Sequence, residues 1–148
     1  MLRQDDLKEN THLIDKYFPF NIFCNTGKGD NILHLHWHDN IEIIYVIEGH
    51  AIFDIGGQSL EAVPGDIFFV NSGRLHSGYS IENTEVVYYA IVFGKSLFAS
   101  YSPDPYYTKY INPFLEGNYC FPVALRKNDE HYNDIRSIIL SIINEFEQ

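Results

Sequence analysis

Three histidines and one glutamate in this chain have side chains and spacing that suit the binding of a metal ion or a polar ligand. In the run HLHWHDNIE, His36, His38 and Glu42 are separated by even numbers of residues, so on an extended strand they would point to the same face. Irregular backbone at residues 39–40 could disturb that alternation. His76 follows on a later candidate strand and could bring a third imidazole to the same place.

These four side chains are compatible with two kinds of site. Three imidazoles and one carboxylate form a ligand set for a divalent transition metal ion, namely Zn²⁺, Fe²⁺, Mn²⁺, Ni²⁺ or Cu²⁺, and leave coordination positions open for water or substrate. The same groups could instead form the hydrogen-bonding wall of a pocket, or be polar core groups that satisfy one another. Both interpretations follow from the residue types.

The segment that must position these residues is rich in β-strand signals. Between residues 33 and 93, short runs of Val, Ile, Tyr and Phe alternate with turn signals at a spacing of roughly ten residues, which indicates an all-β sandwich or barrel. Gly56-Gly57 predicts a tight hairpin, because glycine tolerates the positive φ values of primed turns. We expect the clearest strands at 41–47, 51–55, 67–70 and 86–93.

The chain after residue 94 has a different character. Its aromatic-rich first part contains Pro103, Pro105 and Pro113, which prevent a long helix, so we expect short helices and turns packed on the barrel. The last part predicts an amphipathic helix at about 129–147, which Asn128 or Asp129 could cap. Its apolar face could cover the barrel of its own chain or form a dimer contact. That face consists of Ile135, Ile138, Ile139, Ile142, Ile143 and Phe146.

The composition indicates one acidic domain. A chain of 148 residues has the usual size of a single domain, and its 20 acidic and 10 basic residues give a formal charge of −10. The basic residues are scattered along the sequence, so this segment alone should not bind DNA. No apolar run has the length needed to span a bilayer, so we expect no membrane partner.

The two cysteines and the polar N-terminus indicate in which cellular compartment the protein resides. Cys24 and Cys120 lie far apart without a CxxC spacing, so we expect two buried small apolar residues rather than a disulfide. No basic and apolar signal sequence is present in the starting run MLRQDDLKEN. We therefore expect a cytoplasmic protein.

Two motifs resemble those of the cupins. The pattern His36-x-His38-x3-Glu42-x6-Gly49 matches the first cupin motif, and Gly65-x5-Asn71-x-Gly73-x2-His76 resembles the second. Asp30, Asn71 and Ser80 depart from the usual residues, although none of them is a ligand position. The resemblance implies a mainly β fold, the double-stranded β-helix or jelly-roll barrel, followed here by C-terminal α-helices.

A second resemblance covers nearly the whole chain. The runs HWHDNIEIIYVIEG, LEAVPGDIFFVNSGRLHSGYS, YYAIVFGKSLF and KYINPFLEG look like the N-terminal sensing and dimerisation domain of AraC-type transcription regulators. This implies an N-terminal arm at 1–20, a cupin barrel at 21–96 and a helical segment at 97–148 with a dimerisation helix at about 129–147. It also implies that DNA is bound only through a helix-turn-helix domain, which is absent from this chain.

Strand parity and loop position nominate further pocket residues. Ile44 continues the face of Glu42, and either Tyr88 or Tyr89 must point inward, where its ring could stack on an effector. Arg74 could meet an anionic effector at the barrel mouth, and His34 could add an imidazole near the rim. The expected ligand-binding set is His34, His36, His38, Glu42, Ile44, Arg74, His76 and Tyr88, with His36, His38, Glu42 and His76 as the metal ligands.

The favoured function is therefore small-molecule sensing. A sugar or another small effector would bind in the barrel and alter a homodimer formed through the C-terminal helix, and thereby control the DNA-binding domain. The alternative is a metal-dependent cupin enzyme, a dioxygenase or isomerase, because an open coordination site can activate water, oxygen or a carbonyl. No catalytic residue is assigned for it. A storage or structural cupin would instead have its interior filled by side chains.

Overall fold

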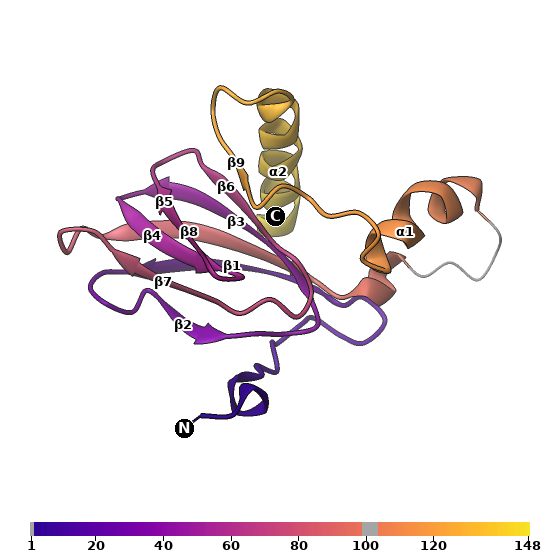
Figure 1. Cartoon of the computed structure of the whole chain (residues 1–148). Helices are drawn as coiled ribbons and strands as arrows, with labels where there is room; N and C mark the ends of the chain where they lie inside the picture. Colours follow the sequence, from indigo (N-terminus) through magenta and orange to yellow (C-terminus); the bar gives the residue numbers. More distant parts are fainter. Residues whose placement is uncertain (1, 99–103) are drawn as a thin grey trace.

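The computed structural model describes residues 2–98 and 104–148 and shows two antiparallel sheets packed face to face (Figure 1). The five-stranded sheet has the order β1 (Phe20–Gly27), β8 (Val86–Phe93), β3 (Ile41–Glu48), β6 (Ile67–Val70) and β9 (Ala124–Leu125). The four-stranded sheet has the order β2 (Leu33–His36), β7 (His76–Ser80), β4 (Ala51–Ile55) and β5 (Gln58–Ala62). The predicted mainly β cupin fold is confirmed.

The strands lie where the sequence predicts them. Those expected at 51–55, 67–70 and 86–93 coincide with β4, β6 and β8, and the one expected at 41–47 continues for one residue in β3. Gly56 and Gly57 join β4 to β5 with φ values of 56° and 87°, as the predicted hairpin requires. The agreement reflects short apolar runs bounded by glycine and proline turns.

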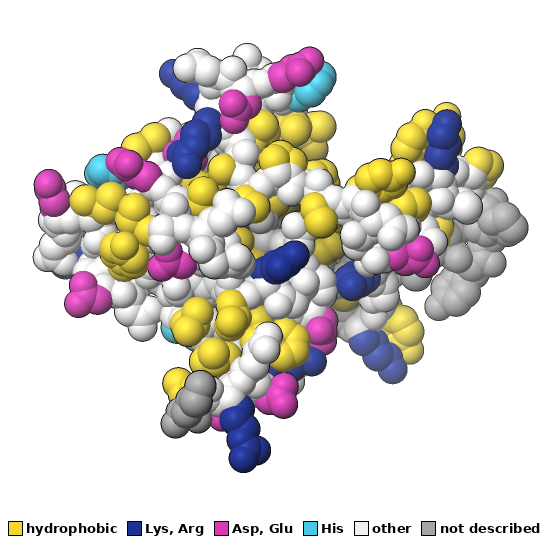
Figure 2. Space-filling model, viewed as in Figure 1, with side chains coloured by type: hydrophobic (Ala, Val, Ile, Leu, Met, Phe, Trp, Pro, Cys, Tyr) yellow, Lys and Arg dark blue, Asp and Glu magenta, His cyan; other side chains and the backbone are white. Residues whose placement is uncertain are grey.

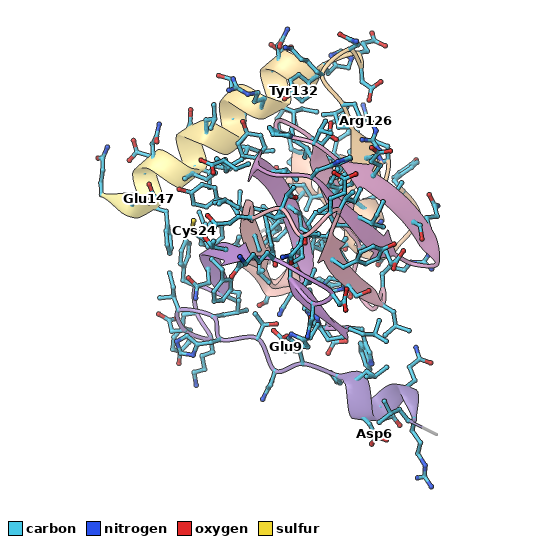
Figure 3. All side chains as sticks on the ribbon, turned by 90° about the vertical axis from the view of Figure 1, so that its left-hand side faces the viewer. Asp6, Glu9, Cys24, Arg126, Tyr132 and Glu147 are labelled. Carbon is cyan, nitrogen blue, oxygen red and sulfur yellow. The ribbon has the colours of Figure 1, made fainter. Side chains whose placement is uncertain are left out.

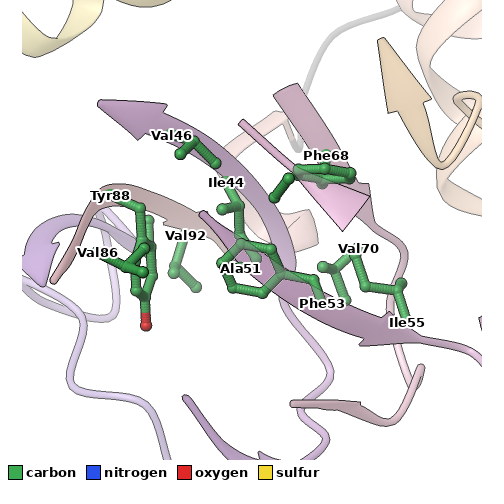
Figure 4. Close-up of a cluster of buried hydrophobic side chains, with 12 residues drawn as sticks. Ile44, Val46, Ala51, Phe53, Ile55, Phe68, Val70, Val86, Tyr88 and Val92 are labelled. Atoms are coloured by element: carbon green, nitrogen blue, oxygen red, sulfur yellow. The ribbon is translucent and has the colours of Figure 1, made fainter. Parts of the chain in front are cut away.

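A hydrophobic core fills most of the space between the two sheets (Figure 4). Alternate residues of β3, such as Ile44 and Val46, point inward and meet Phe53 of the opposite sheet. The ring of Phe53 lies 5.6 Å from that of Phe68 and 5.5 Å from that of Tyr88. This packing fixes the distance between the sheets and leaves the polar residues near one end of the barrel.

The last helix, α2 (Tyr132–Glu147), covers the outer face of the five-stranded sheet. Ile139 and Ile143 are 2% and 3% exposed, whereas Ile138 is 59% exposed. The predicted apolar face is thus divided. One side packs on the barrel of the same chain, and the other side faces away from it.

The helix begins later than predicted. Its N-cap position is His131, which has φ 65° and makes no side-chain capping bond, so the predicted cap at Asn128 or Asp129 is wrong. The Asp129 carboxylate accepts a hydrogen bond from the backbone N–H of Arg126 instead, at 2.7 Å. Asp129 therefore closes the turn before the helix.

The segment before β9 contains the short helices expected there. They are η2 (Lys95–Phe98), the π-helix η3 (Tyr107–Ile111) and α1 (Asn112–Leu115). Pro103 lies outside the described residues. Among the residues that the structure describes, no helix is both long and apolar enough to cross a membrane.

The prediction that both cysteines are buried is wrong. Cys24 is exposed because its neighbours Phe23 and Asn25 point into the barrel, so the alternating side chain of β1 faces outward. Cys120 is exposed in the turn between α1 and β9. Both are free thiols.

The first turn of α2 is tied to the barrel by a partly buried hydrogen bond. The Tyr132 hydroxyl donates to the carbonyl of Gly65 at 2.6 Å. We expect Tyr132→Phe to lower the free energy of unfolding by about 1 kcal/mol, because the partly buried carbonyl of Gly65 loses its partner while the ring still packs. Urea denaturation measures this, with Tyr17→Phe on the exposed arm as the control that leaves stability unchanged. Equal stability of Tyr132→Phe and the parent would contradict it.

Candidate functional site

His36, His38, Glu42 and His76 meet between the two sheets at one end of the barrel. All four are buried, and one donor atom of each lies within 4.8 Å of the others. His36 ends β2 and pairs with His76 at the start of β7, whereas Glu42 belongs to β3 of the opposite sheet. The expectation that the first three residues share one strand is wrong. They converge because residues 37–40 carry the chain from one sheet to the other.

The Glu42 carboxylate lies at the centre of this cluster. Its Oε2 atom is 2.8 Å from Nε2 of His38 and 3.0 Å from Nε2 of His76. The His36 and His76 rings lie 4.2 Å apart between centroids. Nitrogen and oxygen ligands about 2.1 Å from one ion stand roughly 3 Å from each other, so these separations suit a coordination shell.

The other ring nitrogens are held by the backbone. Nδ1 of His36, His38 and His76 lies 2.7, 3.0 and 2.8 Å from the carbonyl oxygens of His34, Asn40 and Arg74, respectively. A carbonyl only accepts hydrogen bonds, so each Nδ1 must carry a hydrogen. With an ion bound, each ring would present the lone pair of Nε2 to the centre, which for His38 and His76 replaces a hydrogen bond to Glu42. This is the arrangement typical of a metal-binding histidine. The residues therefore fit a divalent transition metal ion.

The charges of the cluster favour an ionised carboxylate. Burial raises the pKa of the Glu42 carboxyl, but the hydrogen bonds from His38 and His76 outweigh it and bring that pKa down to about 2. Burial lowers the pKa of His36, so this ring is held neutral. Burial also lowers the pKa of His38, but its contacts with Glu42 have the larger combined effect and raise it. A negative charge surrounded by imidazoles is a suitable environment for a cation.

A cavity of about 360 Å³ opens beside the cluster, and we call it the barrel cavity. Its volume is in the usual range for small-molecule sites, and its wall combines polar groups with apolar ones. A storage or structural cupin was expected to have an interior filled by side chains, and this open cavity argues against that hypothesis. Its lining residues are Glu9, Thr11, Phe23, Asn25, Asn31, Ile32, Leu33, His34, His36, His38, Glu42, Tyr88, Ala90 and Val92.

The structure resolves the choice between the two tyrosines. Tyr88 points inward, is 1% exposed and donates from its hydroxyl to the carbonyl of Ile32 at 3.1 Å. Burial also raises its pKa far above the usual range, so it stays a neutral hydroxyl. Tyr89 points outward and donates to a carboxylate oxygen of Glu147 in α2 at 2.8 Å.

Three other nominated residues lie in different surroundings. His34 lines the barrel cavity and its side chain is 61% exposed at the rim, where it stacks on His36. Ile44 belongs to the hydrophobic core and does not line the cavity. The expectation that Arg74 lies at the cavity mouth is contradicted. Its exposed side chain lies near Gly56 and is not among the residues that line the barrel cavity.

Sequence reasoning missed the part of the cavity built by the N-terminal arm. Glu9 and Thr11 reach the wall because the arm pairs with the chain around Trp37, through an isolated bridge between Lys8 and Trp37. Figure 3 shows the arm with Glu9 on the side of the barrel away from α2. A single bridge of this kind has no periodic pattern that would reveal it.

The comparison with protein families decides which family the chain belongs to. The family model for the AraC-like ligand binding domain matches residues 24–146, which is most of the chain. The chain belongs to this family. The resemblance to cupins and to AraC-type sensing domains is thereby confirmed.

Relatives of this AraC-like domain include a transcriptional regulator and a binding protein. The chain is 34% identical over 91 residues to the uncharacterized HTH-type transcriptional regulator YdeC of Bacillus subtilis, covering 57% of this chain and 31% of that protein. It is 32% identical over 59 residues to an oxalate-binding protein of Thermotoga maritima, covering 39% of this chain and 49% of that protein. The chain thus spans less than half the length of either relative.

Solved structures show the same fold. A cupin protein from Bacteroides fragilis matches with a TM-score of 0.50 and 17% identity, over 57% of this AraC-like chain and 73% of that one. At this identity the likeness concerns the fold alone.

Proposed function

We propose that this chain is the effector-sensing and dimerisation domain of an AraC-type transcription regulator. The observation that carries the proposal is the barrel cavity, which is open to solvent and lined by buried imidazole, carboxylate and hydroxyl groups. The match to an HTH-type regulator supports a role in transcription. Effector binding would control a helix-turn-helix domain outside this chain, and such a regulator acts in the cytoplasm.

A metal ion at His36, His38, Glu42 and His76 would be part of this effector site. The ion would supply a Lewis-acid contact for an oxygen atom of the effector. The protein's own contribution is orientation, because the backbone carbonyls hold each ring by Nδ1. Tyr88, Asn25 and the apolar side chains of the cavity would then contact the rest of a sugar, sugar acid or aromatic acid.

The outward side of α2 would form the dimer contact. Ile138 is 59% exposed on this side of the helix, and exposed apolar surface can mark a subunit interface. DNA contact would belong to the missing domain, because Lys and Arg side chains are scattered over the face in Figure 2 and do not form one basic patch.

Ligand screening tests the sensor function. We expect at least one member of a panel of sugars, sugar acids and aromatic acids to stabilise the domain by about 2.7 kcal/mol at a concentration of 100 Kd. That corresponds to a rise in melting temperature of roughly 5–10 °C. Thermal shift finds the binder and calorimetry gives its stoichiometry. A broad panel without any binder, for both metal-loaded and metal-free protein, would contradict the proposal.

The second candidate is a metal-dependent cupin enzyme. The buried set of three histidines and one glutamate favours it, because such a set leaves open coordination positions. Protein loaded with Mn²⁺ or Fe²⁺ should then consume oxygen or convert a carboxylate substrate over many turnovers. Turnover that disappears in His76→Ala would favour the enzyme, whereas stoichiometric binding without turnover favours the sensor.

A further inference from the structure

We propose that the effector is a small carboxylic acid and that Glu9 of the N-terminal arm occupies its carboxylate subsite when the effector is absent. This inference rests on the proposed sensing function and names the chemical class of its ligand. In this arrangement the arm carries an internal competitor for the acid, and acid binding displaces it.

The surroundings of Glu9 form a carboxylate-binding site. Its Oε2 atom lies 2.9 Å from Nε2 of His34 and 3.3 Å from Nε2 of His36. Its Oε1 atom accepts a hydrogen bond from the Thr11 hydroxyl at 3.2 Å. The two imidazoles are stacked at 4.4 Å between centroids, so their Nε2 edges face the same carboxylate. The side chain of Glu9 is only 29% exposed.

The imidazoles of the barrel cavity limit where an acid can bind. The lining residues that the structure describes include no lysine or arginine, so a carboxylate would be held by imidazoles, by neutral donors such as the Thr11 hydroxyl and the Asn25 amide, or by a bound metal. His38 and His76 already contact Glu42 through Nε2. With an ion bound, Nε2 of His36 would be engaged as well, so His34 is the imidazole left at the solvent side, and Glu9 covers it.

The arm is attached weakly enough to be displaced. The backbone N–H of Glu9 donates to the carbonyl of Trp37 at 2.8 Å, and the backbone N–H of Trp37 donates to the carbonyl of Leu7 at 3.0 Å. The indole N–H of Trp37 donates to the carbonyl of Gln4 at 2.7 Å. Lys8 forms an exposed ion pair with Asp39. Partly exposed ion pairs and a single short bridge contribute little stability each, so a ligand of moderate affinity can exchange with them.

Glu9, His34 and His36 could also be considered as three metal ligands, because their donor atoms lie within 4.8 Å of one another. Nε2 of His36 is, however, shared with the buried four-residue cluster. One lone pair binds one ion, so the two sites cannot both use it. We assign the metal to the buried four-residue cluster, because backbone carbonyls orient all three of its histidines.

Trp37 makes the displacement measurable. It is the single tryptophan of the chain, and its indole N–H contacts the arm. The probes are benzoate and malonate, each compared with its uncharged amide, benzamide or malonamide. We expect the acids to shift the Trp37 emission and the amides to leave it unchanged. In Glu9→Ala the Kd for the acids should fall at least tenfold, because the intramolecular competitor is gone. Asp5→Ala, on the same arm, is the control with parental affinity.

Each other result has a defined meaning. Equal binding of acids and amides, or an unchanged acid Kd in Glu9→Ala, overturns the proposal. A loss of Zn²⁺ affinity of tenfold or more in Glu9→Ala overturns it too, because Glu9 would then be a metal ligand. If sugars bind but acids do not, the sensor stands and this inference fails. If no compound binds the parent or the variant, the sensing function itself fails.

Discussion

Replacing His76 with alanine is expected to reduce the metal content of the domain from about one ion per chain to less than about a tenth. His76 is fully buried, and its Nε2 atom lies 3.0 Å from Glu42 in the centre of the cluster. Loss of a residue that only supports a ligand costs 10–100-fold in affinity, so loss of a ligand itself should cost more than about 100-fold. Elemental measurement after dialysis, and calorimetry with Zn²⁺ and Mn²⁺, give the content and the affinity.

The controls separate ligand loss from misfolding. His50→Ala removes a partly exposed histidine whose Nε2 contacts Glu61 rather than the cluster, so its metal content should equal that of the parent. His76→Gln keeps most of the buried volume and should lose the metal as well. Circular dichroism and melting in EDTA show whether each variant folds. A folded His76→Gln with one tightly bound ion would contradict the metal site, as would a parent that binds none of the five candidate ions.

The fold was predictable because its signals are local. The strands are short apolar runs, and the turns between them contain glycine at positions with positive φ, such as Gly56 and Gly57. The cupin motifs also identified the four central residues, since ligand spacing follows from the barrel connections. Their convergence nevertheless depends on a crossing between sheets, and side-chain parity along one strand does not describe it.

The contacts that sequence reasoning missed are non-local. Glu9 reaches the barrel cavity only because residues 7–9 pair with Trp37. The Arg74 side chain lies near Gly56, which is distant in sequence, rather than at the barrel cavity. The start of α2 is decided by the Asp129 carboxylate, which closes a turn with Arg126. In each case a contact formed in the folded state overrides the local preference.

Truncation of Ile139 in α2 is expected to lower the free energy of unfolding by about 2–5 kcal/mol, which is a large part of the stability of a domain of this size. Ile139 is 2% exposed and packs with the apolar residues on the outer face of the five-stranded sheet. Ile139→Ala therefore removes buried apolar area and leaves a cavity between α2 and the sheet. Urea denaturation followed by circular dichroism measures the loss.

Ile138 is the matched control, one residue earlier on the same helix and 59% exposed. Ile138→Ala should change the stability of the single chain by less than about 0.5 kcal/mol, because it removes little buried area. If α2 also forms the dimer contact, Ile138→Asp should shift sedimentation from dimer to monomer while the cavity still binds its effector. If the parent sediments as a monomer, α2 only covers the barrel of its own chain. If Ile138→Ala and Ile139→Ala destabilise the domain equally, the helix does not pack as described.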